Sequence, residues 1–241
     1  MAGNVRLFVN DDLGQGQSVS LSRPQAHYLF GVMRLELGAQ LLLFNRQDGE
    51  WAAEVTEAGK RGGQVLCLQQ QRPLAMPPDL WLLFAPIKKA RTDFIVEKAV
   101  EMGVRRICPV LTEFTNAERV KQERLQAHAV EAAEQCGATY VPEVAAAEKF
   151  DRVLGGWDPA RRIMFCNEGL AGSAAPLPGG LAGASWAVLI GPEGGFSQPE
   201  RARLAKADHA HGVSLGPRIL RADTAAVAAL TLWQTQLGDW R

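Results

Sequence analysis

Two glycine-rich segments near the C-terminus have the residue types and spacing of a binding site. In LIGPEGGFSQPE (residues 189–200) an apolar run leads into Gly-Pro-Glu-Gly-Gly, and in SLGPRILRADTAA (214–226) a shorter apolar run leads into Gly216-Pro217. Glycine lets the backbone approach a ligand closely and adopt positive φ. Two such turns after neighbouring strands would form one pocket from backbone amides and carbonyls. The alternative is that both are ordinary turns.

The absence of two phosphate-binding motifs restricts the class of ligand that such a pocket would bind. The chain contains neither G-x-x-x-x-G-K-[ST] nor G-x-G-x-x-G. These are the patterns of the P-loop and of the dinucleotide-binding turn, in which backbone amides hold phosphate groups. A neutral or cationic ligand held mostly by backbone groups therefore fits better than a phosphate.

The elements that position the two turns are predicted by hydrophobic pattern. Apolar strands alternate with helices after the proline-rich linker 72–79, and Ser197 and Glu200 form a capping-box pattern before one helix. Continuous apolar strands alternating with helices predict an α/β fold whose parallel sheet is covered on both faces. In such sheets, ligands bind at the carboxyl ends of the strands. The expected strands are LWLLFAP, ICPVL, RIMFCN, WAVLIG and GVSLG, and the expected helices begin near residues 92, 118, 197 and 222.

The first 72 residues have a different pattern. Short apolar-polar alternations, VRLFV, QSVSL, AQLLLF, EWAAEV and GQVLCLQ, are separated by turn residues. One helical stretch, SRPQAHYLFGVMR, interrupts them, with Ser22 as the N-cap. This pattern predicts a small β-barrel. We therefore expect two domains, residues 1–72 and 73–241.

Composition excludes several classes of protein. Of the 241 residues, 47% are hydrophobic and 22% are charged, which argues against a disordered chain. The chain has 26 basic and 26 acidic residues, and this balance argues against a polybasic nucleic-acid binder. No apolar run reaches the roughly 18–20 residues of a membrane span. The start has no signal-peptide pattern, and the four cysteines form no C-x-x-C. We therefore expect a cytoplasmic protein without a membrane partner or a metal site, and no catalytic role for its four histidines.

The pair LIGPEGGFSQPE and LGPRILRADTAAVAAL resembles the 16S ribosomal RNA uridine-N3 methyltransferases of the SPOUT superfamily. The resemblance extends to RLFV, HYLFGVMRLELG, KKARTDFIVEKAVEMGV and EAAEQCG, and so covers the whole chain. It implies a PUA-like barrel that binds RNA, followed by an α/β methyltransferase domain with a deep C-terminal trefoil knot. It also implies the cofactor S-adenosylmethionine, the substrate 16S rRNA in the assembled small subunit, and a homodimer whose site lies at the subunit interface.

The resemblance also suggests which residues do the work. Arg221 would contact substrate or stabilise the uracil anion, or it would only pair with Asp223 or Glu193 to hold the turn. Glu193 would be a base, or would only orient neighbouring groups. The residues expected around the cofactor are Cys166, Asn167, Glu168, Ile190, Gly191, Pro192, Gly194, Gly195, Leu215, Gly216, Ile219, Leu220, Thr224 and Ala225.

RNA must be held by local positive charge, because net charge is balanced. Lys88, Lys89 and Arg91 are the densest basic cluster, and Arg6, Arg23 and Arg34 of the barrel are the second candidate set. The alternative for the cluster is a solvated loop. The chain departs from the family pattern twice: it has Ala138 and Thr139 just after EQ-x-G, where an arginine is usual, and Phe114 where an arginine is frequent. These departures weaken any transfer of RNA contacts to those regions.

Two other functions compete with an RNA methyltransferase. A non-catalytic RNA-binding ribosome-assembly factor on the same fold would lack cofactor affinity despite intact turns. A small-molecule enzyme on an ordinary open sheet would have a deep pocket within one subunit and no basic surface. Binding of S-adenosylmethionine separates the first function from both alternatives.

Overall fold

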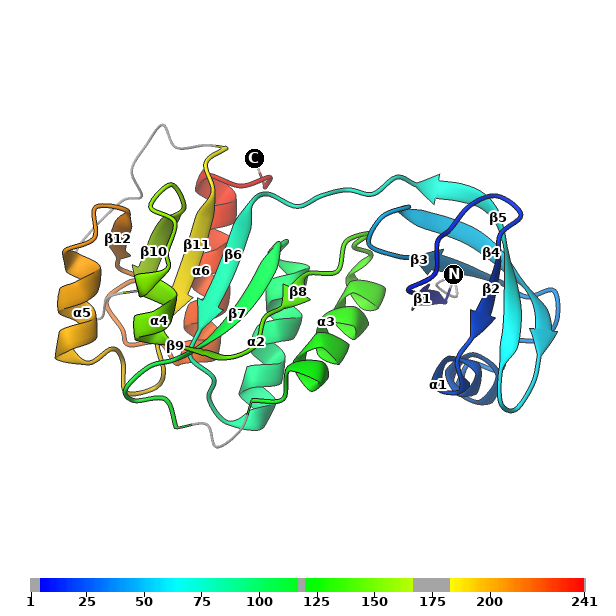
Figure 1. Cartoon of the computed structure of the whole chain (residues 1–241), viewed down its shortest axis with the longest axis horizontal. Helices are drawn as coiled ribbons and strands as arrows, with labels where there is room; N and C mark the ends of the chain where they lie inside the picture. The colour runs from blue at the N-terminus through cyan, green and yellow to red at the C-terminus, as the bar shows by residue number, and fades with distance from the viewer. Residues whose placement is uncertain (1–4, 117–119, 167–182, 241) are drawn as a thin grey trace. The chain divides into compact units, whose positions relative to one another are not determined.

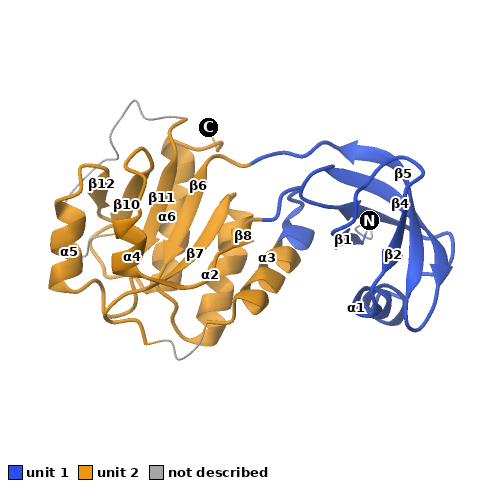
Figure 2. Cartoon of the chain, in the orientation of Figure 1, with its two compact units in different colours: residues 1–76, 133–141 blue, residues 77–132, 142–241 orange. Residues whose placement is uncertain are grey.

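The computed structural model describes residues 5–116, 120–166 and 183–240, which form two compact units (Figures 1 and 2). The first unit comprises residues 1–76 and 133–141, and the second comprises 77–132 and 142–241. Residues 133–141, which the sequence pattern assigned to the second domain, thus cluster with the first unit. Hydrogen bonds explain this: Arg6 donates to the carbonyl oxygens of Ala133 and Ala138 at 2.6 and 2.8 Å.

The first unit is built on a mixed five-stranded sheet in the order β1-β3-β4-β5-β2. β1 runs parallel to β3, and the other neighbours are antiparallel. Inward-facing side chains such as Leu43, Val55 and Val65 form its core. The strands are β1 (Arg6–Phe8), β2 (Ser18–Leu21), β3 (Gln40–Phe44), β4 (Glu50–Ala58) and β5 (Gly63–Arg72).

The predicted helix of the first unit is only partly an α-helix. α1 (Arg23–Ala26) continues as a π-helical turn, η1 (His27–Val32), in which the Met33 amide donates to the Tyr28 carbonyl. A side chain at Gly31 would begin 3.0 Å from the His27 ring, so glycine permits this wider turn.

The second unit contains a parallel sheet in the order β12-β10-β11-β6-β7-β8, with β9 also paired to β7. Both faces are covered, as the apolar strands predict. α2 and α6 pack together on one face, where α6 contacts β11, while Phe150 of α4 and Leu204 of α5 join the core of the other face (Figure 1). The strands are β6 (Leu80–Phe84), β7 (Arg106–Leu111), β8 (Glu143–Val144), β9 (Glu148–Lys149), β10 (Arg162–Cys166), β11 (Trp186–Ile190) and β12 (Ala210–Val213).

The helices of this unit include one that the sequence pattern did not suggest, α4. The last expected strand is displaced from its predicted place, 212–216: β12 begins at Ala210 and ends at Val213, after which the Ser214 side chain accepts the Gly216 amide at 3.3 Å in a turn. The trefoil knot stays a prediction. The helices are α2 (Lys89–Glu101), α3 (Gln122–Cys136), whose last four residues belong to the first unit, α4 (Phe150–Gly155), α5 (Gln198–Ala205) and α6 (Ala222–Gln236).

Candidate active site

The two glycine turns leave the same edge of the parallel sheet. The first follows β11 and the second follows β12, and β10 lies between these strands, with Phe165 opposite Leu189 and Cys166 opposite Val213. Because all three strands are parallel, their carboxyl ends meet at one edge, where α/β proteins bind ligands.

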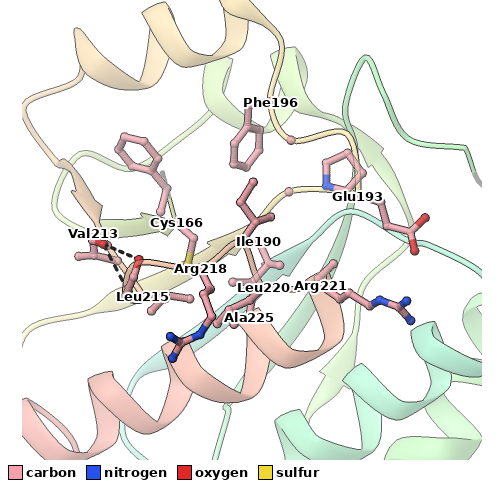
Figure 3. Close-up of a pocket in the computed structure, with 18 of the residues that line it drawn as sticks. Cys166, Ile190, Glu193, Phe196, Val213, Leu215, Arg218, Leu220, Arg221 and Ala225 are labelled. Carbon is pink, nitrogen blue, oxygen red and sulfur yellow. Dashed lines mark hydrogen bonds between the residues drawn. The ribbon is translucent and has the colours of Figure 1, made fainter. Parts of the chain in front are cut away.

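A cavity of about 770 Å³ lies at this edge (Figure 3). This volume lies within the range of about 300–1,000 Å³ typical of small-molecule sites. Both predicted catalytic residues, Glu193 and Arg221, line it. So do ten of the residues expected around the cofactor: Cys166, Ile190, Gly191, Pro192, Gly195, Leu215, Gly216, Ile219, Leu220 and Ala225.

Four expected cofactor residues are not among those lining the cavity. Gly194 and Thr224 belong to the turns and to α6 but do not line the cavity. Asn167 and Glu168 lie outside the described residues. The lining residues that sequence reasoning missed are Phe165, Phe196, Arg201, Val213, Ser214, Arg218 and Ala222. Five of them could have been found, because each is adjacent to a residue already assigned to the site: Phe165, Phe196, Ser214, Arg218 and Ala222.

The first turn is tightly built around its glycines. Gly195 has φ +70°, in the left-handed region that favours glycine, and its amide donates to the Pro192 carbonyl at 2.9 Å. A Cβ on Gly191 would lie 3.1 Å from the Phe196 ring, and one on Gly194 would lie 3.3 Å from Phe114. The backbone at Gly191 and Gly194 therefore lies close to two aromatic side chains.

The predicted capping box fixes where α5 begins after the first turn. The Ser197 amide donates to Glu200 Oε2 at 2.8 Å, and the Glu200 amide donates to Ser197 Oγ at 3.5 Å. The buried Glu200 carboxylate also accepts the backbone amide of Glu113, at 2.9 Å, in the segment after β7. One carboxylate thus connects the first turn to a neighbouring loop.

The second turn is more open than the first. Gly216 has φ +111°, and a Cβ there would meet nothing within 4 Å. Ile219 is 76% exposed although it lines the cavity, and Arg218 is also exposed. Figure 3 shows Arg218 and Arg221 extending in different directions from this turn.

The charges at the cavity are arranged differently from the expected pairing. The Arg91 guanidinium, not that of Arg221, forms an ion pair with the Glu193 carboxylate, and Arg91 Nε lies 3.9 Å from Asp223 Oδ2. Arg221 is the N-cap residue of α6 and its side chain is exposed. Within residues 5–116, 120–166 and 183–240, no ion pair or hydrogen bond of the Arg221 side chain is found, so its guanidinium is available at the cavity.

Cys166 contributes an apolar part of the cavity wall. Burial raises the pKa of its thiol to about 12, because the interior disfavours the thiolate. The thiol is therefore neutral near pH 7 and is not a nucleophile. In the described part of the chain, no group of three or more histidine, cysteine, aspartate or glutamate residues could hold a metal ion. No described helix is long and apolar enough to cross a membrane.

The predicted RNA-binding role of Arg6 does not agree with the structure, because its side chain is used inside the first unit. Its side chain is 11% exposed, Nε lies 2.6 Å from Glu50, and the other guanidinium nitrogens donate to the carbonyl oxygens of Ala133, Glu134 and Ala138. All of these partners belong to the first unit. The guanidinium is thus used inside the fold and is not available to a phosphate.

The other basic candidates are placed differently. Lys88 and Lys89 at the start of α2 are exposed, as are Arg23 and Arg34 of the first unit, whereas Arg91 is engaged with two carboxylates. Arg34 has φ +56°, which is uncommon for a residue other than glycine.

The three residues at the two departures from the family pattern have structural partners. Ala138 accepts a hydrogen bond from Arg6, the buried Thr139 accepts the Ala75 amide at 2.9 Å, and Phe114 lies beside Gly194.

Comparison with known proteins identifies both units. The family described as "RNA methyltransferase domain" matches residues 75–234, and "RNA methyltransferase PUA domain" matches residues 21–66. The chain is 33% identical to "Ribosomal RNA small subunit methyltransferase E" of Synechocystis over 88% of this chain and 71% of that protein. It is 29% identical to the protein of the same name from Rickettsia conorii, over 93% of each chain.

A solved structure shows the same architecture. The crystal structure of a ribosomal RNA small subunit methyltransferase E from Neisseria gonorrhoeae, bound to S-adenosyl methionine, superposes with a TM-score of 0.89 and 26% identity. It covers 99% of this chain and 100% of the other. A PUA-like unit joined to a parallel α/β unit with a pocket at the carboxyl edge defines an RNA-modifying enzyme. The chain belongs to the RNA methyltransferase family.

Proposed function

We propose that this protein transfers the methyl group of S-adenosylmethionine to N3 of a uridine in 16S rRNA. The observation that carries this proposal is the cavity between two glycine turns, with the guanidinium of Arg221 available beside it. The names of the relatives, small-subunit ribosomal RNA methyltransferases, support the substrate class.

The residues present fit the cofactor. S-adenosylmethionine combines a flat adenine, a ribose and a charged methionine part, and the cavity offers apolar side chains together with exposed backbone at Gly191, Gly195 and Gly216. A Cβ on Gly191 would lie only 3.1 Å from the Phe196 ring, so a side chain at this position would crowd the wall. The absence of side chains here leaves backbone groups to face the ligand.

Each wall would hold a different part of the cofactor. Gly191, Pro192 and Gly195 would contact the methionine and ribose, while Leu215 and Leu220 would enclose the adenine. When bound, the cofactor supplies an electrophilic methyl group on a sulfonium. The protein therefore contributes mainly by placing the acceptor nitrogen in line with that methyl group.

The uridine is the harder partner to activate, because N3 carries a proton and is a poor nucleophile near neutral pH. Arg221 would lie beside the uracil oxygens and stabilise the negative charge that develops as the N3 proton leaves to water. Glu193 would orient the first turn through Arg91, since this ion pair keeps its carboxylate engaged. N3 lies on the pairing edge of the base, so the target must be unpaired or flipped out.

RNA would be held by exposed cations on both units. Lys88 and Lys89 would contact phosphates near the catalytic pocket, and Arg23 and Arg34 would do so from the PUA-like unit. We further propose that the substrate is the assembled small subunit and that the protein acts in the cytoplasm.

We also propose that the protein is a homodimer with a knotted C-terminal region. The 76% exposure of Ile219 beside the cavity supports a subunit interface there, because burial of an exposed apolar side chain stabilises an interface.

The test is mass spectrometry of 16S rRNA from cells with and without this protein. Loss of one methylated uridine, restored by the wild-type chain but not by Arg221→Ala, is the expected result. An unchanged methylation pattern contradicts the proposal. Restoration by the Arg221→Ala chain would instead favour a catalytic group elsewhere.

A further inference from the structure

Arg91 lies between the two turns that form the cavity. It belongs to the first turn of α2, an element separate from both glycine turns. Its Nη1 pairs with Glu193 of the first turn, and its Nε lies 3.9 Å from Asp223 in the first turn of α6, directly after the second glycine turn. One guanidinium thus contacts Glu193, which lines the cavity, and Asp223, which directly follows the second turn without lining the cavity.

The Glu193 and Asp223 carboxylates both approach the Arg91 guanidinium. Glu193 and Asp223 carry the same charge and, without Arg91, would repel each other across the cavity edge. Arg91 is 27% exposed and Asp223 is 22% exposed, so both are partly shielded from solvent, whereas Glu193 is more open at 48%. Partial burial weakens solvent screening of the attraction.

We propose that Arg91 is a positioning residue that sets the spacing of the two cofactor-binding turns, rather than a contact to RNA phosphate. Arg91 does not itself line the cavity, and among the described residues its ion pairs with Glu193 and Asp223 connect it to the two turns. This inference rests on the proposed function, because it assumes that the cavity between the turns is the cofactor site. Arginine suits the position because its planar fork presents several donors to separate acceptors, whereas lysine provides a single ammonium group.

The experiment measures S-adenosylmethionine binding by calorimetry and methylation kinetics for the full-length wild type, Arg91→Gln and Arg91→Lys. We expect Arg91→Gln to raise the Kd and KM for the cofactor about tenfold, the sum of two partly exposed charge contacts, with kcat at saturating cofactor within about twofold. The Kd of Arg91→Lys for the cofactor should lie between those of the wild type and Arg91→Gln, because lysine keeps one of the two contacts. Equal cofactor affinity in all three proteins overturns the proposal.

A double-mutant cycle tests whether the effect passes through Glu193. In a Glu193→Gln background, Arg91→Gln should raise the Kd by clearly less than tenfold; an undiminished effect would contradict the proposed path. Arg203→Gln is the matched control, since Arg203 pairs with Asp151 at 2.7 Å but does not line the cavity. Its cofactor affinity should equal that of the wild type.

RNA binding separates this role from the alternative. If Arg91 contacts phosphate, Arg91→Gln will weaken RNA binding and flatten its salt dependence while cofactor affinity stays unchanged, and the positioning role is then wrong. A wild-type protein that does not bind S-adenosylmethionine would instead overturn the proposed function itself.

Discussion

The two glycine turns of the cavity are held in very different ways. The first is braced on several sides: Gly195 closes a hydrogen-bonded turn onto Pro192, aromatic rings lie against Gly191 and Gly194, and the capping box at Ser197 fixes the chain beyond. The first turn is therefore a wall that exists before any ligand arrives.

Within a single chain, the second turn is held by fewer contacts than the first. Among the residues described, its side-chain hydrogen bonds up to Arg221 are those between Ser214 and Gly216, at 3.3 and 3.4 Å. Its remaining residues include the exposed Arg218 and Ile219. The contrast suggests a division of labour, in which the first turn sets the position of the cofactor and the second adjusts to it and to the RNA.

The strongest effect is expected in the braced turn. Gly195→Val should abolish measurable cofactor binding, because a β-branched residue at φ +70° costs up to about 3 kcal/mol and its side chain adds bulk to a cavity wall. Gly216→Val also strains the backbone, at φ +111°, but a Cβ there meets nothing within 4 Å and the turn around it is open, so its Kd should rise only about tenfold. Calorimetry measures the cofactor affinity of both variants. Equal losses of affinity would contradict the proposed difference between the two turns.

A control separates local backbone strain from loss of the site. Gly183 also has positive φ, +81°, a Cβ there would meet nothing within 4 Å, and the residue does not line the cavity. Gly183→Val should therefore bind the cofactor like the wild type. Loss of binding in this variant would show that strain anywhere in the unit has the same effect.

The second prediction concerns the catalytic role of the open turn. Arg221→Ala should lower kcat about 100-fold, comparable to removing one charge-stabilising donor, and should change cofactor affinity by less than about threefold. Single-turnover methylation of 16S rRNA with saturating cofactor measures the effect. An unaltered rate would remove Arg221 from the chemistry.

A smaller effect is expected for the two exposed lysines at the start of α2. Replacing Lys88 and Lys89 by alanine should weaken RNA binding about tenfold and reduce the slope of log K against log salt by about 1.5, without affecting cofactor binding. Lys149→Ala, an exposed lysine of β9, is the matched control. A slope equal to that of the wild type would argue against phosphate contacts by the pair.

The smallest expected effect is a change in backbone amide hydrogen exchange when the cofactor binds. Cofactor binding should slow amide hydrogen exchange several-fold in residues 214–221 and change it little in 191–196, because only the open turn gains new order. Exchange measured by mass spectrometry with and without S-adenosylmethionine tests this. Equal protection of both segments would contradict the division between them.

Local signals predicted much of this architecture. The apolar strands indicated a parallel sheet covered on both faces, and the positions of Ser197 and Glu200 indicated the start of α5, because both depend on neighbouring residues. β8 and β9 have two residues each and α4 has six, too few to produce a periodic pattern.

Contacts between distant residues could not be predicted. Arg91 and Glu193 are 102 positions apart, so nothing in either segment indicated that Arg91, rather than Arg221, pairs with Glu193. The same holds for Arg6, whose partners around residues 133–138 lie more than 120 positions away. Sequence placed these arginines among the candidate cations, and only the fold distinguishes those used internally from those left exposed.

The most direct test of the cavity as the cofactor site is calorimetric titration of the wild-type chain with S-adenosylmethionine in the absence of RNA. We expect saturable binding of one cofactor per chain, and loss of that binding in Gly195→Val but not in Gly183→Val. A wild-type titration without binding, or an affinity untouched by Gly195→Val, would contradict the claim that the two turns enclose the methyl donor.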